Sequence, residues 1–288
     1  MNILITGGTG FIGRNLIKEL RLSHNIFLLL HKSICKEYVD LPTVNIDDGI
    51  ERLSSFMSEN KIDGIVHLAS LYLSNHKGAQ IKGLIDSNVY LGTAVLEAAT
   101  SVNVKWFLNV GTIWQNYKVI EDEYNPVNLY AATKQAFVDV AQYYVDAYGI
   151  KFCTLKLCDT YGPCDTRNKI INLFKTNSEK GDLLKMSPGN QKLDLLYISD
   201  VVSGFVHLID MLSSCECIAK EYVLSSGRLL TLREIASIFE NVTSLKLNIE
   251  WGGLPYRERE VMMPWQGNVL PQWQPLVNLE KGILNIMK

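Results

Sequence analysis

A glycine-rich turn near the start of the chain constrains the fold more than any other feature. The apolar run Asn2–Ile5 leads directly into Thr6-Gly7-Gly8-Thr9-Gly10-Phe11-Ile12-Gly13, and a helical pattern of apolar residues follows. In a G-x-x-G-x-x-G turn, Gly7 and Gly10 let the backbone bend tightly and approach a pyrophosphate, and Gly13 lets the helix pack close to the strand. The helix N-terminus offers free N–H groups to phosphates. A strand, glycine turn and helix in this order predict a dinucleotide-binding site.

Strand-like and helix-like segments alternate through the first half of the chain. The expected strands cover residues 2–6, 26–30, 43–46, 64–69, 106–110 and 152–157, and the expected helices cover 14–22, 49–59, 87–99 and 129–148. This alternation is typical of an α/β fold with a parallel, doubly wound Rossmann sheet.

The character of the sequence changes after the segment Tyr161-Gly162-Pro163. Elements become shorter, turns become more frequent, and residues 251–273 are rich in tryptophan. We therefore expect a nucleotide-binding domain over residues 1–159 and a smaller C-terminal substrate-binding domain over 160–288. Residues 193–212 are expected to return to the first domain.

Charge and composition exclude several classes of protein. The net charge of −2 comes without a basic run, which argues against a nucleic-acid partner. Apolar stretches fall short of the about 18 residues that span a membrane, and the first residues lack a signal-peptide pattern. The six cysteines are scattered apart from Cys215-Glu216-Cys217, so we expect a cytoplasmic protein with reduced thiols and no metal site.

The segment Tyr130-Ala-Ala-Thr-Lys134 contains a candidate catalytic pair within the predicted helix 129–148. A spacing of four places both side chains on one helix face, where an ammonium group favours the phenolate and lowers the pKa of the tyrosine. Many ordinary amphipathic helices also carry this spacing. Thr112 adds a hydroxyl at the end of the strand 106–110, at the sheet edge where ligands of this architecture bind.

Together these motifs resemble the short-chain dehydrogenase/reductase superfamily, in its extended branch of NAD-dependent epimerases and dehydratases that modify sugar nucleotides. The resemblance covers most of the chain, including residues 65–69, Asn88, 161–163 and 191–201. It implies that Tyr130 transfers a proton and that Thr112 orients the substrate oxygen. It also implies that Lys134 lowers the Tyr130 pKa and bonds the nicotinamide ribose, while the cofactor carries the hydride.

The resemblance also implies which residues contact the cofactor. They are Gly7, Thr9, Gly10, Phe11, Ile12, Gly13, His31, Lys32, Asp47, Leu68, Ala69, Ser70, Asn88, Tyr130 and Lys134. Asp47 corresponds to an adenine-contacting aspartate, whereas Asn88 and His67 are expected to bond backbone or pack rather than react. Because His31 and Lys32 follow the second strand without a carboxylate, NADP(H) is favoured over NAD. The alternative for Lys32 is a solvated loop lysine.

Three reaction classes share this triad: epimerases, 4,6-dehydratases and 4-ketoreductases. The dehydratases carry Asp-Glu directly after the hydroxyl residue, where this chain has Ile113-Trp114, and the epimerases hold NAD tightly. The second half of the chain is most similar to CDP-abequose and CDP-paratose synthases, which are NADPH-dependent reductases of a 4-keto-3,6-dideoxyhexose. The segments that carry this similarity are 155–157, 161–165, 169–171, 189–192 and 253–262.

The expected substrate is therefore a nucleotide-linked 4-keto sugar, a hexose or a heptose, with its base left open. Arg257 is expected to meet the diphosphate, because guanidinium suits phosphate, and Lys169 is a further candidate for substrate binding. Two positions depart from the branch: Leu193 replaces a usual arginine, and an asparagine is missing from Cys158-Asp159-Thr160.

Two helices, near 87–99 and over 129–148, carry more apolar residues than one buried face needs. The excess in the second comprises Val138, Val140, Tyr143, Tyr144 and Val145. The resemblance implies that these helices pair with their copies in a four-helix bundle, which makes the protein a homodimer. Two other functions stay open: a nucleotide-sugar 4-epimerase with tightly bound NAD, and a non-catalytic NADP-binding regulator.

Overall fold

A seven-stranded parallel sheet forms the centre of the protein, with the strand order β10-β6-β5-β4-β1-β2-β3. The computed structural model describes residues 1–31, 38–118, 123–214 and 218–288. The strands of the central sheet are β1 (Asn2–Thr6), β2 (Asn25–Leu30), β3 (Thr43–Asn45), β4 (Gly64–His67), β5 (Trp106–Thr112), β6 (Lys151–Leu157) and β10 (Glu221–Leu224). The predicted α/β fold with a doubly wound Rossmann sheet is confirmed.

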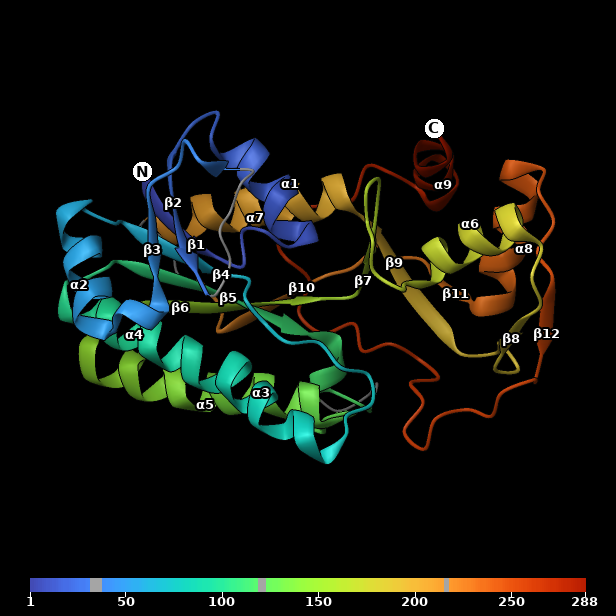
Figure 1. Ribbon diagram of the computed structural model, residues 1–288, viewed down its shortest axis with the longest axis horizontal. Coiled ribbons are helices and arrows are strands. Elements are labelled where there is room, and N and C mark those ends of the chain that lie inside the picture. The colour runs from blue at the N-terminus through green and yellow to red at the C-terminus, as the bar shows by residue number, and fades with distance from the viewer. Residues whose placement is uncertain (32–37, 119–122, 215–217) are drawn as a thin grey trace.

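Helices cover both faces of this sheet, as Figure 1 shows. One face is covered by α1 (Phe11–Leu20) and α7 (Ile198–Ser213), and the other by α2 (Ile50–Glu59), α4 (Leu91–Ser101) and α5 (Leu129–Tyr148). Successive residues of β1 enter different cores: Ile3 and Ile5 face one cluster, and Leu4 faces the other. Strands buried on both faces are continuous apolar runs, which is why their positions were readable from the sequence.

Two element boundaries differ from the sequence-based expectation. Helix α1 begins at Phe11 rather than at residue 14, because Gly10 already serves as its N-cap with an extended backbone. The helix expected over 87–99 is preceded by α3 (Ile81–Ile85) and a π-helical turn, Asp86–Tyr90, before α4 starts. The expected bounds of β1 and α5 match those of the structure.

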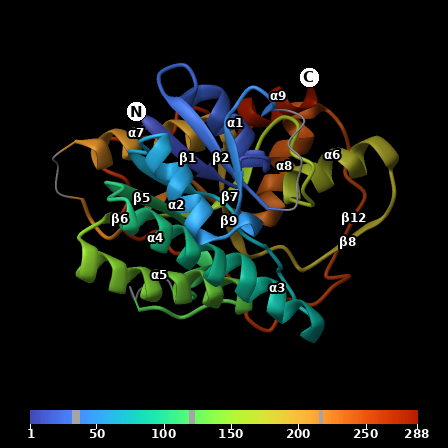
Figure 2. The same cartoon turned by 60° about the vertical axis from the view of Figure 1, so that its left-hand side comes forward.

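A second group of elements lies beside the central sheet, on the right in Figure 1 and seen from another side in Figure 2. It contains a three-stranded sheet of β11 (Leu229–Thr231), β9 (Lys192–Tyr197) and β7 (Asp159–Tyr161). A two-stranded sheet pairs β12 (Ile249–Trp251) with β8 (Leu184–Met186). The helices of this group are α6 (Ile170–Lys180), α8 (Leu232–Thr243) and α9 (Leu279–Met287).

The chain passes between the two groups more than once. Strand β9, at the start of the segment 193–212, belongs to the three-stranded sheet, whereas α7 packs on α1 and β10 pairs with β6. Near the C-terminus, Val269 forms a bridge with Val223 of β10. The division into domains at residues 159 and 160 therefore stays a prediction. Of the helices that the structure describes, none is long and apolar enough to cross a membrane.

Candidate active site

The glycine turn after β1 has the tight geometry that its sequence predicted, and two glycines are required for steric reasons. Gly7 has φ +70°, and a Cβ there would lie 2.6 Å from the backbone nitrogen of Ala69. A Cβ on Gly13 would lie 2.4 Å from the carbonyl oxygen of Gly7. Gly10 caps α1 without a side chain, so the first N–H groups of the helix face the turn. This turn can receive a phosphate group.

A cavity of about 300 Å³ lies along the turn and the carboxyl ends of β2 and β4. The predicted cofactor residues that line it are Gly7, Thr9, Gly10, His31, Leu68, Ala69 and Ser70. Further lining residues, not predicted from the sequence, are Thr6, Gly8, Leu29, Leu30, Ser87 and Leu91. The cavity lies at the sheet edge where ligands of doubly wound folds bind, and its backbone cradle fits a dinucleotide.

Buried polar side chains fix the wall of this cavity. The Thr6 hydroxyl accepts a hydrogen bond from the Ala69 N–H at 3.1 Å and bonds His67 Nδ1 at 2.9 Å. His67 is fully buried against two phenylalanine rings, and burial, followed by the charge of Lys134, lowers its pKa to about 3. His67 is therefore neutral at physiological pH and packs, as the sequence suggested.

The Asn88 side chain holds the loop after β4 in place through hydrogen bonds. Its Oδ1 accepts from the Leu71 N–H at 2.7 Å, and its Nδ2 donates to the Leu71 carbonyl at 3.0 Å and to the Thr133 hydroxyl at 2.9 Å. The expectation that Asn88 bonds backbone is confirmed, and its contact with a cofactor stays a prediction. These bonds tie the loop beside the cavity to α5, the helix that carries Tyr130 and Lys134.

Tyr130 and Lys134 lie one turn apart near the start of α5, and both are buried. The Asn128 side chain caps this helix by accepting from the Ala131 N–H at 3.0 Å. Thr112 ends β5, where its hydroxyl accepts from the Trp114 N–H at 3.3 Å. All three predicted catalytic side chains thus belong to well-defined elements next to the carboxyl edge of the sheet.

Burial dominates the pKa of Tyr130, and the expected lowering of that pKa by Lys134 stays a prediction. Burial raises the pKa of Tyr130 to about 12, and burial also lowers the pKa of Lys134 to about 8. Among the groups that oppose the rise at Tyr130, the charge of Lys169 comes first, ahead of a hydrogen bond from Ser70 and the charge of Arg167. Removing the phenol from water outweighs the neighbouring cations, because the charged form loses its hydration.

Aromatic rings surround the Tyr130 phenol. Tyr72 meets Tyr130 edge-on, with 5.1 Å between ring centroids, and Trp114 lies 5.8 Å from Tyr72. Sequence reasoning noted Trp114 only as a replacement for an acidic residue, and it missed Tyr72. The position of Tyr72 just after the motif 65–69 was the available signal, because residues after such a strand lie at the ligand-binding edge.

Basic side chains from several segments lie around this aromatic cluster. Lys169 Nζ is 4.7 Å from the Tyr72 ring centroid and 2.8 Å from Asp159 Oδ1. The exposed Arg257 guanidinium lies 5.7 Å from the Trp114 ring. Arg259 instead lies over Tyr117 at 4.3 Å and bonds Asn125.

Other predicted residues lie away from the aromatic cluster around Tyr130 or outside the residues that the structure describes. His31 Nε2 is 3.8 Å from Asp47 Oδ1, and both side chains are about half exposed; Lys32 lies outside the described residues. Leu193 lines a separate cavity of about 190 Å³ together with residues 275–279. Among the described residues, no cluster of three or more His, Cys, Asp or Glu side chains has an arrangement that could bind a metal ion.

Comparison with known proteins places this site in context. The sequence model described as "NAD dependent epimerase/dehydratase family" matches residues 3–217. A CDP-abequose synthase of Salmonella typhimurium is 25% identical, over 99% of this chain and 97% of its own length. A CDP-abequose synthase of Yersinia pseudotuberculosis is 27% identical, over 92% of each chain.

Solved structures show the same fold at lower identity. UDP-glucuronic acid 4-epimerase from Bacillus cereus, in complex with UDP-glucuronic acid and NAD, superposes with a TM-score of 0.85 at 20% identity. That alignment covers 99% of this chain and 98% of the epimerase. UDP-glucose 4-epimerase from Thermotoga maritima, with UDP-glucose, has a TM-score of 0.84 at 20% identity, over 100% of this chain and 98% of its own.

Proposed function

The chain belongs to the NAD dependent epimerase/dehydratase family, and on that premise we propose that it reduces the 4-keto group of a nucleotide-linked deoxy sugar with NADPH. The observation that carries this proposal is the environment of Tyr130. Its phenol is buried near the start of α5, one turn from Lys134 and at the carboxyl edge of the sheet, where a positioned phenol can donate a proton to a carbonyl oxygen.

Each group of residues at the site has a separate role in the proposed reaction. A nicotinamide cofactor, when bound, supplies the hydride for the carbonyl carbon. The glycine turn and the N-terminus of α1 would hold its pyrophosphate, and Lys134 would bond its ribose. Thr112 orients the carbonyl oxygen, and Tyr130 donates the proton, so that the C=O group becomes a CH–OH group.

The side chains after Thr112 argue against dehydration. Loss of water from a sugar needs an acid and a base near C5 and C6, and this chain offers Ile113 and Trp114 at those positions. Trp114 contributes an apolar ring next to Tyr72 instead. The relatives named CDP-abequose synthase, which align over nearly the whole chain, support a keto sugar as substrate.

For the cofactor we propose NADP(H), with His31 and Lys32 as the residues that recognise the 2′-phosphate. His31 lines the cavity beside the glycine turn, at the end of β2. The family also includes users of NAD, as the epimerase complexes illustrate. Equilibrium titrations of the protein with NADPH and NADH test this choice, and tighter binding of NADH would contradict it.

For the substrate diphosphate we propose Arg257 as the main ligand, with Lys169 beside it. The Arg257 guanidinium is exposed and lies next to Trp114. It can therefore reach an anion bound between the two groups of elements, and a guanidinium bonds phosphate oxygens in pairs.

We also propose a homodimer in which α5 and the helical segment 87–99 pair with their copies in a four-helix bundle. Tyr90 and Tyr143 are 60% exposed and Tyr148 is 54% exposed, which is high for large aromatic side chains on regular helices. A second copy of the chain would cover them. Light scattering at micromolar concentration tests this part, and a monomeric mass would contradict it.

The main experiment is a cofactor-consumption screen over CDP-, dTDP- and GDP-linked 4-keto sugars with NADPH. We expect NADPH oxidation with at least one of them. The alternative favoured by the solved structures is a 4-epimerase, which would purify with bound NAD and interconvert UDP-hexoses without added cofactor. A protein that binds NADPH without turning over any of these sugars would be a binding subunit.

A further inference from the structure

An ion pair that the proton transfer itself does not require faces the catalytic phenol. Asp159, the first residue of β7, lies 2.8 Å from Lys169, the N-cap of α6. Both side chains are only 23% exposed, so solvent screens the pair less than it would screen a pair on the surface.

Lys169 points toward Tyr72, and Tyr72 points toward Tyr130. The Lys169 ammonium lies 4.7 Å from the Tyr72 ring, and the Tyr72 ring lies edge-on to Tyr130 at 5.1 Å. The chain thus places the Lys169 ammonium against the Tyr72 ring and that ring against the ring of the catalytic phenol, with residues from α6, the loop after β4 and α5.

The charged groups that face these two rings are few. Burial raises the pKa of Tyr130, and after burial the charge of Lys169 is the largest influence, followed by Tyr72, the Ser70 hydrogen bond and Arg167. At Tyr72 the charges are Lys169, Asp159, Arg257 and Arg167, in that order. Lys134, on the same helix as Tyr130, is itself buried.

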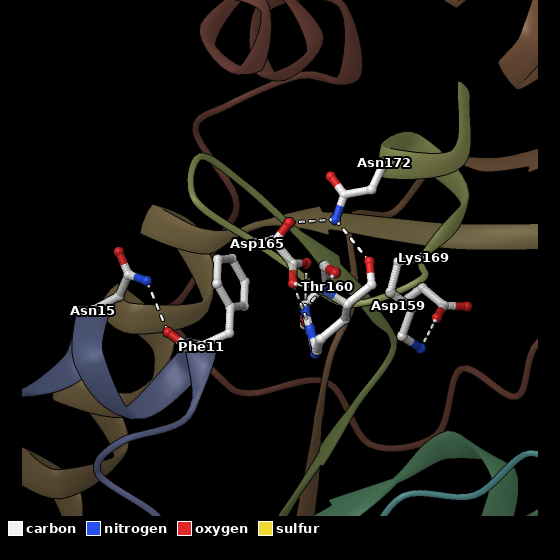
Figure 3. A network of polar contacts seen from close by, with 8 residues as sticks. Phe11, Asn15, Asp159, Thr160, Asp165, Lys169 and Asn172 are labelled. Carbon is white, nitrogen blue, oxygen red and sulfur yellow. Dashed lines mark hydrogen bonds and ion pairs between the residues drawn. The ribbon is translucent and has the colours of Figure 1, made fainter. Parts of the chain in front are cut away.

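A network of polar contacts orders the loop between the two residues of the pair, and Figure 3 shows it beside the Asp159–Lys169 contact. Arg167 donates to the Thr160 carbonyl and hydroxyl at 3.0 Å and pairs with Asp165 at 2.8 Å. Asn172 donates to the carbonyls of Asp165 and Arg167 at 2.7 and 2.9 Å. This loop therefore presents Lys169 in a fixed position, which is what electrostatic stabilisation requires.

We propose that Lys169 is a positioning residue for proton transfer: its charge, moderated by Asp159, stabilises the phenolate that forms when Tyr130 donates its proton. Both charges are present before and after the transfer, and Asp159 partly offsets the charge of Lys169 throughout. The inference rests on the proposed function only in that Tyr130 must transfer a proton. This role is additional to contact with the substrate diphosphate, because a phosphate ligand alone would affect substrate binding without affecting the phenol.

The test measures the proton affinity of the residue at position 130 directly, without turnover. The full chain is made with 3,5-difluorotyrosine in place of Tyr130, which brings the phenol titration into a range where proteins stay folded. The titration is followed by fluorine NMR in the parent chain and in Lys169→Met, Lys169→Arg and Asp159→Asn. Lys180→Met is the matched control, because Lys180 is an exposed lysine of the same helix.

The two halves of the ion pair should act in opposite directions. We expect Lys169→Met to raise the titration midpoint by about one pH unit and Asp159→Asn to lower it, since a nearby charge shifts a pKa by about 1–3 units. Lys169→Arg and Lys180→Met should leave the midpoint unchanged. Equal midpoints in the parent chain and Lys169→Met would overturn the proposal, as would shifts of the same sign in Lys169→Met and Asp159→Asn.

Kinetics on the 4-keto sugar that the screen identifies provide a second readout. We expect Lys169→Met to lower kcat at least tenfold and Lys169→Arg to restore most of it. A rise in KM alone, with kcat and the fluorine midpoint unchanged, would make Lys169 a phosphate ligand only. Because the fluorine titration needs no substrate, failure of the screen and failure of this inference are separate results.

Discussion

The glycine turn and the Asp159–Lys169 region form two sides of the proposed site, but they are built differently. The turn consists of consecutive residues whose backbone contacts exclude side chains, as at Gly7 and Gly13. The Lys169 side is assembled from side chains that lie far apart in the sequence, among them Tyr72 and Trp114. A site made of backbone serves any dinucleotide, whereas a site made of distant side chains can differ between members of the family. Specificity should therefore be sought on the second side.

The largest expected effect is at Tyr130, where the two sides meet. Tyr130→Phe keeps the buried ring and removes the proton donor, so kcat should fall by about 10²–10⁴-fold. Binding of NADPH should change little, because the glycine turn is untouched. Steady-state kinetics and a cofactor titration measure the two quantities, and an unchanged kcat would remove Tyr130 from the mechanism.

The second-largest expected effect comes from a substitution in the glycine turn, the side of the site that is made of backbone. Gly7→Ala places a Cβ 2.6 Å from the Ala69 nitrogen at a φ of +70°, so we expect about 3 kcal/mol of lost stability or cofactor affinity. Gly181→Ala is the matched control, because Gly181 has φ +75° and open space around its Cα. Urea unfolding and NADPH titration are carried out on both variants. Gly181→Ala reports the cost of the positive φ alone, and the additional effect in Gly7→Ala reports the steric clash with Ala69. Equal effects in the two variants would contradict the close approach of the turn to Ala69.

A pH effect tests the wall of the cofactor cavity. The pKa of His67 is about 3 in the folded protein against 6.5 when unfolded, so the unfolded chain binds more protons between these values. The stability that neutral His67 provides is complete above pH 6.5 and is lost as the pH falls toward 3. At pH 5 the loss should be about 2 kcal/mol. Urea unfolding at pH 7 and pH 5 measures it.

The control for this effect is His67→Asn, which does not titrate and still offers an oxygen to the Thr6 hydroxyl. Its stability should depend less on pH than that of the parent protein. The same pH dependence in both proteins would assign the acid sensitivity to other groups.

The smallest expected effect is on the substrate KM and comes from Arg257, on the side of the site that is made of side chains. Arg257 is exposed, so Arg257→Ala should raise the substrate KM about tenfold, which corresponds to about 1.4 kcal/mol, and leave NADPH affinity unchanged. Arg259→Ala is the comparison variant, because Arg259 already contacts Tyr117 and Asn125. A normal KM in Arg257→Ala together with a raised KM in Arg259→Ala would move the diphosphate to Arg259.

The sequence predicted the central sheet well because its signals are local. The apolar run of β1, the glycine turn and the capped amphipathic pattern of α5 lie within single segments, and their bounds match. The π-helical turn at Asp86–Tyr90 escaped prediction, because helical periodicity does not distinguish one extra residue per turn.

The chemistry around Tyr130 was less predictable for a physical reason. Spacing correctly placed Lys134 one turn from the phenol, but a pKa depends on burial and on charges from the whole fold. Burial of Tyr130 and the approach of Lys169 arise only when β7, α6 and α5 pack together. Pairwise spacing therefore identifies candidate residues, whereas the burial that raises the Tyr130 pKa could not be predicted from it.

The most direct test of the central claim is to follow hydride from added cofactor into product. The protein is mixed with NADPH carrying deuterium at the transferred position and with the 4-keto sugar nucleotide identified by the screen. The account predicts one deuterium at C4 of the product and one oxidised cofactor per product molecule. A product sugar without deuterium, formed while the added NADPH stays reduced, would contradict it and indicate an enzyme that returns hydride to the sugar from a bound cofactor.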